Sequence, residues 1–233
     1  MGKTLAEKII AAHAEDVTEV SAGDLVTVRT DVVMANDVTA PIAIQSFQAM
    51  GVEEVYDPNR VMLVPSHFAP NKDIKSAEQT RTLTLFAEEQ ALDHRFQVGR
   101  AGIEHVVLPE RGLVLPGDLI VGGDSHTCTY GAVGAFATGM GSTDIGFAMA
   151  TGKTWLKVPE TMKFVYHGER RPYVYGKDMI LRTIGEIGVD GALYRSMEFT
   201  GPAISALSMS ERFTMANMVI EATGASAIIA GSR

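Results

Sequence analysis

Short apolar runs that alternate with longer amphipathic segments are the feature that most constrains how this 233-residue chain can fold. We predict strands over residues 25–28, 60–64, 113–123, 163–166 and 228–230. We predict helices over residues 4–14, 42–50, 74–92, 143–155, 177–187 and 210–223. Strands that are apolar throughout are typical of parallel sheets with helices on both faces. The expected fold is therefore α/β, a three-layer α/β/α arrangement with a largely parallel sheet.

No low-complexity linker occurs, but the Pro159-Glu160 step is a reasonable boundary between two packed subdomains. We expect residues 1–158 to form a first α/β subdomain and residues 159–233 to form a second, incomplete one. The last three residues, Gly231-Ser232-Arg233, resemble an expression scar more than a continuation, which is compatible both with a truncated chain and with a remainder that is not represented here.

Charge and cysteine content exclude several classes of protein. The formal charge is −8 and no Lys/Arg-rich run occurs, so neither nucleic acid nor an anionic membrane surface has a docking patch. No apolar stretch reaches the roughly 18 residues of a spanning helix, and the charged start lacks the apolar core of a secretory signal. The single cysteine, Cys128, cannot form an internal disulfide, so we expect a reducing, cytoplasmic environment.

Polar residues directly follow two of the predicted strands. Asp124-Ser125-His126-Thr127 comes at the end of residues 113–123, and Ser66-His67-Phe68 comes after residues 60–64. Ligands bind at the carboxyl ends of parallel strands, so both motifs are candidate site segments. Asp and Ser also commonly cap a following helix, and this structural role is compatible with a functional one.

Histidines provide candidates for proton transfer. His67, His105 and His126 follow apolar segments, whereas the other three histidines have the pattern of surface residues. A histidine transfers protons near neutral pH when a carboxylate orients its ring. Asp124 and Glu221 are the carboxylates available for this role.

The Gly123-Asp124-Ser125 sequence also resembles the opening of a serine-esterase motif, in which serine is the nucleophile. Such enzymes place this serine after the first strand and an Asp-x-x-His near the C-terminus. Here Ser125 lies in mid-chain and residues 200–233 contain no histidine. Substrate binding is therefore the better interpretation of Ser125.

Several ordered motifs together resemble the aconitase superfamily, in particular the large subunits of 3-isopropylmalate dehydratase and homoaconitase. They are Asp37-Val38-Thr39-Ala40-Pro41, Ser66-His67-Phe68 with Asn71-Lys72-Asp73-Ile74, Gly122 through Thr127, the glycines up to Gly141, and Met218 with Asn217 and Glu221. The resemblance covers essentially the whole chain. It implies a hydro-lyase that isomerises a hydroxy-di- or tricarboxylic acid by removing water and adding it back, in leucine or related amino-acid biosynthesis.

The resemblance implies acid/base roles for five residues. His67 is similar to the family's histidine that protonates the departing hydroxyl. His105 is similar to a histidine that pairs with an aspartate, here Asp124. His126 is similar to a histidine that pairs with a glutamate, here Glu221.

Two further residues, Ser125 and Asn217, are similar to residues of the family that contact substrate or cluster, and we expect them to bind substrate. Positions 217 and 221 are four residues apart, so they share one face of the helix predicted over residues 210–223.

Two departures from the family pattern are visible. Ser66 stands where the family has an aspartate, and a serine can bond to His67 but cannot stabilise an imidazolium by charge. The family's three cluster cysteines lie beyond the segment represented here, so no metal ligand is expected within this chain. Cys128 matches none of them and is expected to be a packed thiol.

The resemblance finally implies a [4Fe–4S] cluster in the complete enzyme, a small subunit that carries the swivelling domain, and a small-molecule hydroxy acid as substrate. This chain alone is expected to bind no cluster. The alternative function is an inactive truncated fragment that serves only as a folding or assembly piece, whose uncovered apolar surface favours self-association.

Overall fold

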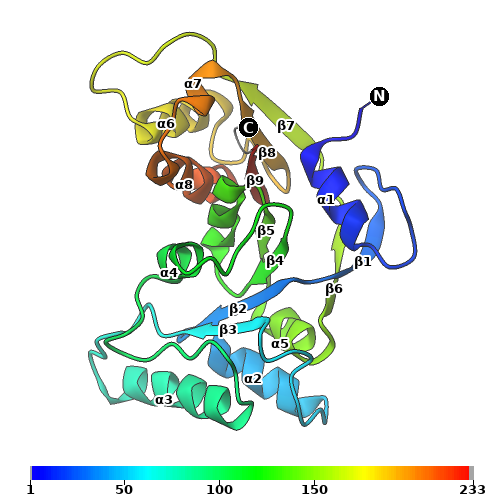
Figure 1. The fold of residues 1–233 in the computed structure, drawn as a ribbon, viewed down its shortest axis with the longest axis vertical. Helices are drawn as coiled ribbons and strands as arrows, with labels where there is room; N and C mark the ends of the chain where they lie inside the picture. Colours follow the sequence, from blue (N-terminus) through cyan, green and yellow to red (C-terminus); the bar gives the residue numbers. More distant parts are fainter. Residues whose placement is uncertain (1, 231–233) are drawn as a thin grey trace.

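A four-stranded parallel sheet, in the order β3-β2-β4-β5, lies at the centre of the computed structural model (Figure 1). Its strands are β2 (Val32–Asn36), β3 (Val61–Val64), β4 (Leu119–Gly122) and β5 (Phe136–Gly139). The structure describes residues 2–230, so the expected expression scar at residues 231–233 lies outside the described residues.

Both faces of this sheet are buried, which is why its strands are apolar without alternation. On one face Val33 and Ala35 share a core with α2 (Ala40–Ala49), α3 (Ile74–Glu89) and α5 (Ser142–Thr151). On the other face Val32 and Met34 pack with α4 (Glu104–Glu110) and with the 3₁₀ helix η1 (Ser125–Val133). The α/β class and the three-layer arrangement expected from the sequence are confirmed.

A second parallel sheet, in the order β7-β8-β9, lies in the upper part of the view in Figure 1, above β4 and β5. It consists of β7 (Thr161–Val165), β8 (Ser196–Thr200) and β9 (Ser226–Ile229). The helices α6 (Gly176–Ile187), α7 (Pro202–Ser205) and α8 (Met209–Asn217) contribute side chains to its core.

Helix η1 joins the two sheets. Its residues Cys128 and Ala132 belong to the core of the second sheet, whereas Tyr130 belongs to that of the first. Gly131 permits this approach, because a Cβ atom at that position would lie 1.7 Å from the backbone oxygen of Ala227 in β9. The segment that follows β4 is therefore held from two sides.

The first helix, α1 (Leu5–His13), begins with a capping box between Thr4 and Glu7 and leads to β1 (Leu25–Arg29). This strand pairs in antiparallel orientation with β6 (Lys153–Lys157). Within residues 2–230 the strands thus form two parallel sheets and one antiparallel pair instead of a single sheet.

Two predicted boundaries are wrong. The helix expected over residues 143–155 ends at Thr151, because Gly152 adopts a φ of +69° and starts the turn into β6. The strand expected over residues 113–123 is limited to Leu119–Gly122, because a turn through Gly117, with φ +89°, precedes it. The sequence pattern also does not predict β2, β5, β6 and β8.

None of the helices described over residues 2–230 combines the length and the apolar character needed to cross a lipid bilayer.

Candidate active site

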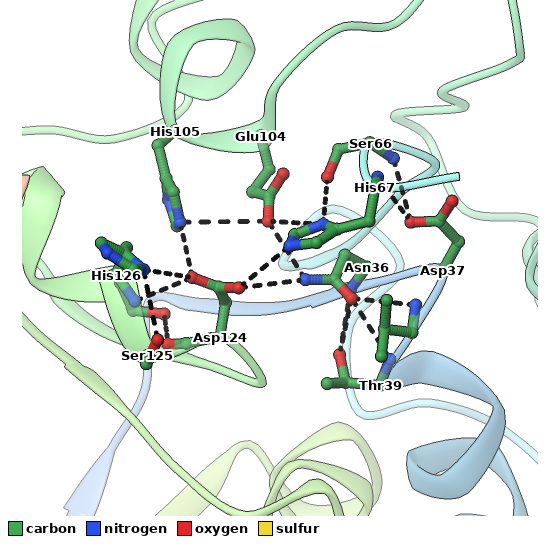
Figure 2. A network of polar contacts seen from close by, with 12 residues as sticks. Asn36, Asp37, Thr39, Ser66, His67, Glu104, His105, Asp124, Ser125 and His126 are labelled. Carbon is green, nitrogen blue, oxygen red and sulfur yellow. Dashed lines mark hydrogen bonds and ion pairs between the residues drawn. The ribbon is translucent and has the colours of Figure 1, made fainter. Parts of the chain in front are cut away.

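Three neighbouring strands of the central sheet end at one edge, and polar residues follow each of them. Because β3, β2 and β4 are adjacent and parallel, their carboxyl ends bring together His67, Asp37 and Asp124. Helix α4 adds Glu104 and His105 from its first turn. The side chains meet in one polar network (Figure 2).

Asp124 is the centre of this network. Its Oδ1 lies 2.9 Å from Nε2 of His105 and accepts a hydrogen bond of 2.8 Å from the backbone N–H of His126. Its Oδ2 lies 3.5 Å from Nε2 of His67 and 3.4 Å from Nδ2 of Asn36. Burial favours the neutral carboxyl, but the hydrogen bonds from His105 and His126 outweigh this effect and lower the pKa of Asp124 to about 2. Asp124 is therefore ionised, so its carboxylate is the acceptor in the contact with His105.

His105 is buried and held in one orientation. Its ring meets the ring of Tyr130 edge-on, with the centroids 5.3 Å apart. Burial, followed by the nearby charges of Glu104 and Asp124, raises the pKa of Tyr130 well above its ordinary value. Tyr130 therefore stays a neutral phenol beside the two acids.

His67 lies between two carboxylates, because Oε1 of Glu104 is 3.7 Å from its Nδ1 and Asp124 is near its Nε2. Asp37 fixes the backbone at this point, since its carboxylate accepts hydrogen bonds from the N–H groups of Ser66, His67 and Phe68. The Ser66 hydroxyl lies 2.9 Å from Nδ1 of His67. The side chain of His67 remains 43% exposed, so a substrate can reach it.

Ser125, His126 and Glu221 lie on the side of the network that faces the second sheet. Ser125 Oγ lies 3.2 Å from Nδ1 of His126, and Nε2 of His126 lies 3.6 Å from Oε1 of Glu221. A hollow beside them is lined by Asp124 and Ser125 together with Met140, Tyr194 and Ile220. Its lining comes from the carboxyl ends of β4 and β5 on one side and from the segments that precede β8 and β9 on the other.

Asn217 is part of the same region but points elsewhere. Its Nδ2 donates a hydrogen bond of 3.0 Å to Oγ1 of Thr129, and its backbone oxygen accepts one from the Cys128 thiol. The helix expected over residues 210–223 is interrupted, because α8 ends at Asn217 and a 3₁₀ helix, η2 (Met218–Ala222), follows. A 3₁₀ helix has three residues per turn, so Asn217 and Glu221 do not share a face as predicted.

Another sequence prediction is wrong at His13, which was expected at the surface. Its side chain is only 14% exposed, and its Nε2 lies 2.6 Å from Oδ2 of Asp31. This hydrogen bond raises the pKa of His13 although burial opposes the shift. The pair joins α1 to the strands of the central sheet and lies outside the candidate site.

The sequence pattern did not identify two polar residues of the network, Glu104 and Asn36. Asn36 directly follows the apolar run of β2, so the rule that selected the other strand ends applies to it as well. Glu104 has no such signal, since a glutamate in the first turn of a helix is ordinarily solvated.

Comparison with known proteins adds a decisive observation. A family model described as "Aconitase family (aconitate hydratase)" matches residues 7–232. The chain belongs to the aconitase family. The resemblance inferred from the motifs is thereby confirmed.

Relatives within the aconitase family are highly similar. The 3-isopropylmalate dehydratase large subunit of Moorella thermoacetica is 62% identical over 98% of this chain and 54% of the relative. The proteins of the same name from Desulfatibacillum aliphaticivorans and Aquifex aeolicus are both 60% identical, over 99% and 98% of this chain and 55% and 52% of the relatives. The chain spans about half the length of these curated relatives.

Membership of the aconitase family implies a [4Fe–4S] cluster in the complete enzyme, and the residues of this chain do not fit one. Such clusters are held by several cysteine thiolates, whereas this chain has only Cys128. Burial raises the pKa of the Cys128 thiol to about 12, and the side chain packs in the core of the second sheet. Cys128 is a packed thiol, as expected.

A single metal ion is the alternative to a cluster as a ligand of this network. One ligand atom each from His67, Glu104 and Asp124 lie within 4.8 Å of one another. The two carboxylates, however, already face imidazoles and the Asn36 amide. The arrangement balances negative charge with protonatable rings and is suited to proton transfer.

Proposed function

We propose that this chain is the N-terminal portion of the large subunit of a hydro-lyase that isomerises a hydroxy-di- or tricarboxylic acid of the 3-isopropylmalate or homoaconitate type. The observation that carries the proposal is the convergence of three histidines on the Asp124 carboxylate at the end of β4, in a chain of the aconitase family. The names of the relatives support the 3-isopropylmalate type and a place in leucine or related amino-acid biosynthesis.

The chemistry requires a proton for the departing hydroxyl, because hydroxide is a poor leaving group. We assign this step to His67, which is exposed on one side and flanked by Glu104 and Asp124. The buried His105 ring contacts the Asp124 carboxylate, keeps it ionised and fixes its orientation beside His67.

His126 is the second exposed imidazole, and Glu221 orients it from η2. In the proposed reaction this pair exchanges a proton with the water that leaves and returns. Ser125 is proposed to contact a substrate carboxylate, since its hydroxyl lines the hollow between the two sheets. Asn217 is assigned to the same region by resemblance, and it must turn its amide from Thr129 to contact substrate directly.

Cofactor, partner and compartment follow from the same proposal. The complete enzyme would take its cluster ligands from cysteines outside this chain and would work with a small subunit that carries the swivelling domain. We also propose that residues 1–158 and 159–233 are two subdomains and that the protein acts in the cytoplasm. The separation of the β3-β2-β4-β5 sheet from the β7-β8-β9 sheet supports the division near residue 158.

The direct test is an assay of the full-length large subunit, combined with its small subunit, on 3-isopropylmalate and homoaconitate. We expect reversible conversion of one of these acids to its isomer through the unsaturated intermediate, followed by absorbance of the double bond. An active, correctly assembled enzyme that converts neither acid would contradict the assignment.

A second candidate function is supported by the cysteine content: the 233-residue chain alone is an inactive folding or assembly piece. Iron and sulfide reconstitution discriminates between the two. The isolated chain should acquire no stable cluster absorbance, whereas the full-length subunit should. A stable cluster on the isolated chain would overturn this assignment of the ligands.

A further inference from the structure

Glu104 is the least expected member of the polar network. It is fully buried in the first turn of α4, yet the only hydrogen bond to its side chain within the described residues is to Oε1, from Nδ2 of Asn36 at 3.1 Å. Its Oε2 is buried and has no hydrogen-bond partner within residues 2–230. A carboxylate in such a place is costly unless nearby positive charge compensates it.

The nearest groups that can carry this charge are two imidazoles. Oε1 of Glu104 lies 3.7 Å from Nδ1 of His67 and 3.9 Å from Nε2 of His105. His105 is already committed to Asp124 at 2.9 Å. His67 is thus the imidazole that Glu104 is free to influence.

Each ring nitrogen of His67 faces an acceptor on a different element. On the Nδ1 side are the Ser66 hydroxyl at 2.9 Å and Glu104 of α4. On the Nε2 side is Asp124, which follows β4, at 3.5 Å. Asp37 adds a third carboxylate, but it is engaged by the backbone N–H groups of residues 66–68.

The remaining charged groups near His67 are farther away or turned aside. His105 and His126 reach it through Asp124, which they both contact. The ammonium of Lys72 lies over the ring of Phe68, 5.4 Å from its centroid. The Lys72 charge opposes protonation of His67, whereas the carboxylates of Glu104 and Asp124 favour it.

We propose that Glu104 is a positioning residue that keeps the proton on Nδ1 of His67 and orients the ring, so that the Nε2–H can be delivered to the departing hydroxyl. This inference rests on the proposed role of His67 as proton donor. A negative charge within about 4–6 Å favours the protonated ring, and a buried carboxylate is screened less than an exposed one. Asn36 supports the arrangement, because its amide contacts both Glu104 and Asp124 and so fixes the two acids on opposite sides of the ring.

The first test uses the 233-residue chain with ¹⁵N-labelled histidine and records the ring nitrogens of His67 by NMR. At neutral pH Nδ1 should carry a proton. A bare Nδ1, with the proton on Nε2 alone and the Ser66 hydroxyl donating to the ring, would overturn the proposal. This measurement needs no substitution and so stands even where a variant fails to fold.

The second test compares Glu104→Gln with Glu110→Gln, an exposed glutamate on the same helix that serves as matched control. Glu104→Gln should lower the titration midpoint of His67 by about one pH unit, and Glu110→Gln should leave it where the wild type has it. An unchanged midpoint in a folded Glu104→Gln variant would contradict the proposal.

A rescue experiment separates charge from packing. Ser66→Asp in the Glu104→Gln background places a carboxylate beside Nδ1 of His67, where the Ser66 oxygen lies 2.9 Å away. Most of the decrease in the titration midpoint of His67 caused by Glu104→Gln should be reversed. A midpoint that stays low would mean that Glu104 acts through packing and would overturn the proposal.

The activity measurement uses the complete enzyme with the same substitutions. Glu104→Gln should lower kcat by up to about tenfold at neutral pH with little change in KM, since a one-unit fall in the titration midpoint lowers the protonated fraction by at most tenfold. A kcat equal to that of Glu110→Gln would count against the proposal. If the wild-type enzyme converts no hydroxy acid, the proposed function fails, while the NMR titrations still decide the role of Glu104.

Discussion

Asp37 shows how one buried side chain sets the geometry of the site. Its carboxylate follows β2 and accepts three backbone hydrogen bonds from the segment after β3, with N···O distances of 3.2, 2.9 and 2.7 Å. These bonds connect the two segments beyond the point where the backbone pairing of β2 and β3 ends. They hold His67 in front of Asp124 without contacting either side chain.

Replacement of Asp37 by asparagine should loosen this segment. The amide NH₂ group would face backbone donors, and the loss of charged hydrogen bonds should lower the free energy of unfolding by about 1–3 kcal/mol. Urea unfolding of the 233-residue chain measures this, with the exposed Asp16→Asn as control. Equal stability of the two variants would show that Asp37 does not hold the segment.

Asp124 should make the free energy of unfolding depend on pH in the acidic range. Its folded pKa of about 2 lies below the ordinary 3.8, so its stabilising contribution is present above about pH 4 and is lost as the pH falls towards 2. The difference corresponds to about 2 kcal/mol. In urea titrations the gap between wild type and Asp124→Asn should therefore shrink from about pH 5 to about pH 2.5. A gap that does not change with pH would contradict the low pKa.

At the scale of elements, the sequence predicts the helices and strands that have a clear apolar periodicity or end at a clear helix-terminating or strand-terminating residue. The helices α1, α2, α3 and α6 and the strands β1, β3, β7 and β9 lie where the apolar pattern places them. The predicted helix over residues 143–155 runs too far because apolar residues continue through Trp155, and only the left-handed Gly152 separates α5 from β6. The strand β8 alternates polar and apolar residues, but only Met197 and Phe199 of its five residues are apolar, so no apolar run marks it.

Part of the site could be predicted because several of its residues directly follow apolar strands. His67, Asp124, Ser125 and His126 follow apolar strands, so topology alone brings them together. Glu104 could not be found this way, since its burial depends on how α4 packs over the end of the sheet. The interruption after Asn217 was also invisible, because 3₁₀ and α-helical segments have similar residue preferences here.

The contact between η1 and β9 provides a test at this scale. A Cβ atom added to Gly131 would lie 1.7 Å from the backbone oxygen of Ala227, so Gly131→Ala must push η1 away from β9. We expect a loss of at least about 3 kcal/mol in the free energy of unfolding. Gly185→Ala in α6, where a Cβ atom meets nothing within 4 Å, should instead stabilise the chain by about 0.5–1 kcal/mol. A Gly131→Ala variant as stable as the wild type would contradict the close packing.

For the whole molecule, the hollow between the sheets continues as an uncovered apolar surface. Trp155, Leu193 and Tyr194 line it and are 60%, 62% and 48% exposed. Monomeric proteins seldom leave such clustered apolar side chains in water. The surface is therefore expected to find a partner, which in the isolated chain is a second copy.

Light scattering should detect this self-association at high protein concentration. Trp155→Arg should weaken it, whereas Ile74→Arg, on the exposed start of α3, should not. A wild-type chain that stays monomeric over the whole concentration range would contradict the prediction.

The most direct test of the account is the turnover of the complete enzyme, large and small subunits together, with Asp124 replaced by asparagine. All three imidazoles of the site face this carboxylate, so its loss should disturb the protonation of each. We predict that kcat for isomerisation falls by about 10²–10⁴-fold while the cluster absorbance is retained. Asp93→Asn, at an exposed loop position, should leave kcat unchanged. A kcat for Asp124→Asn within about twofold of this control would contradict the claim that these residues carry the acid/base chemistry.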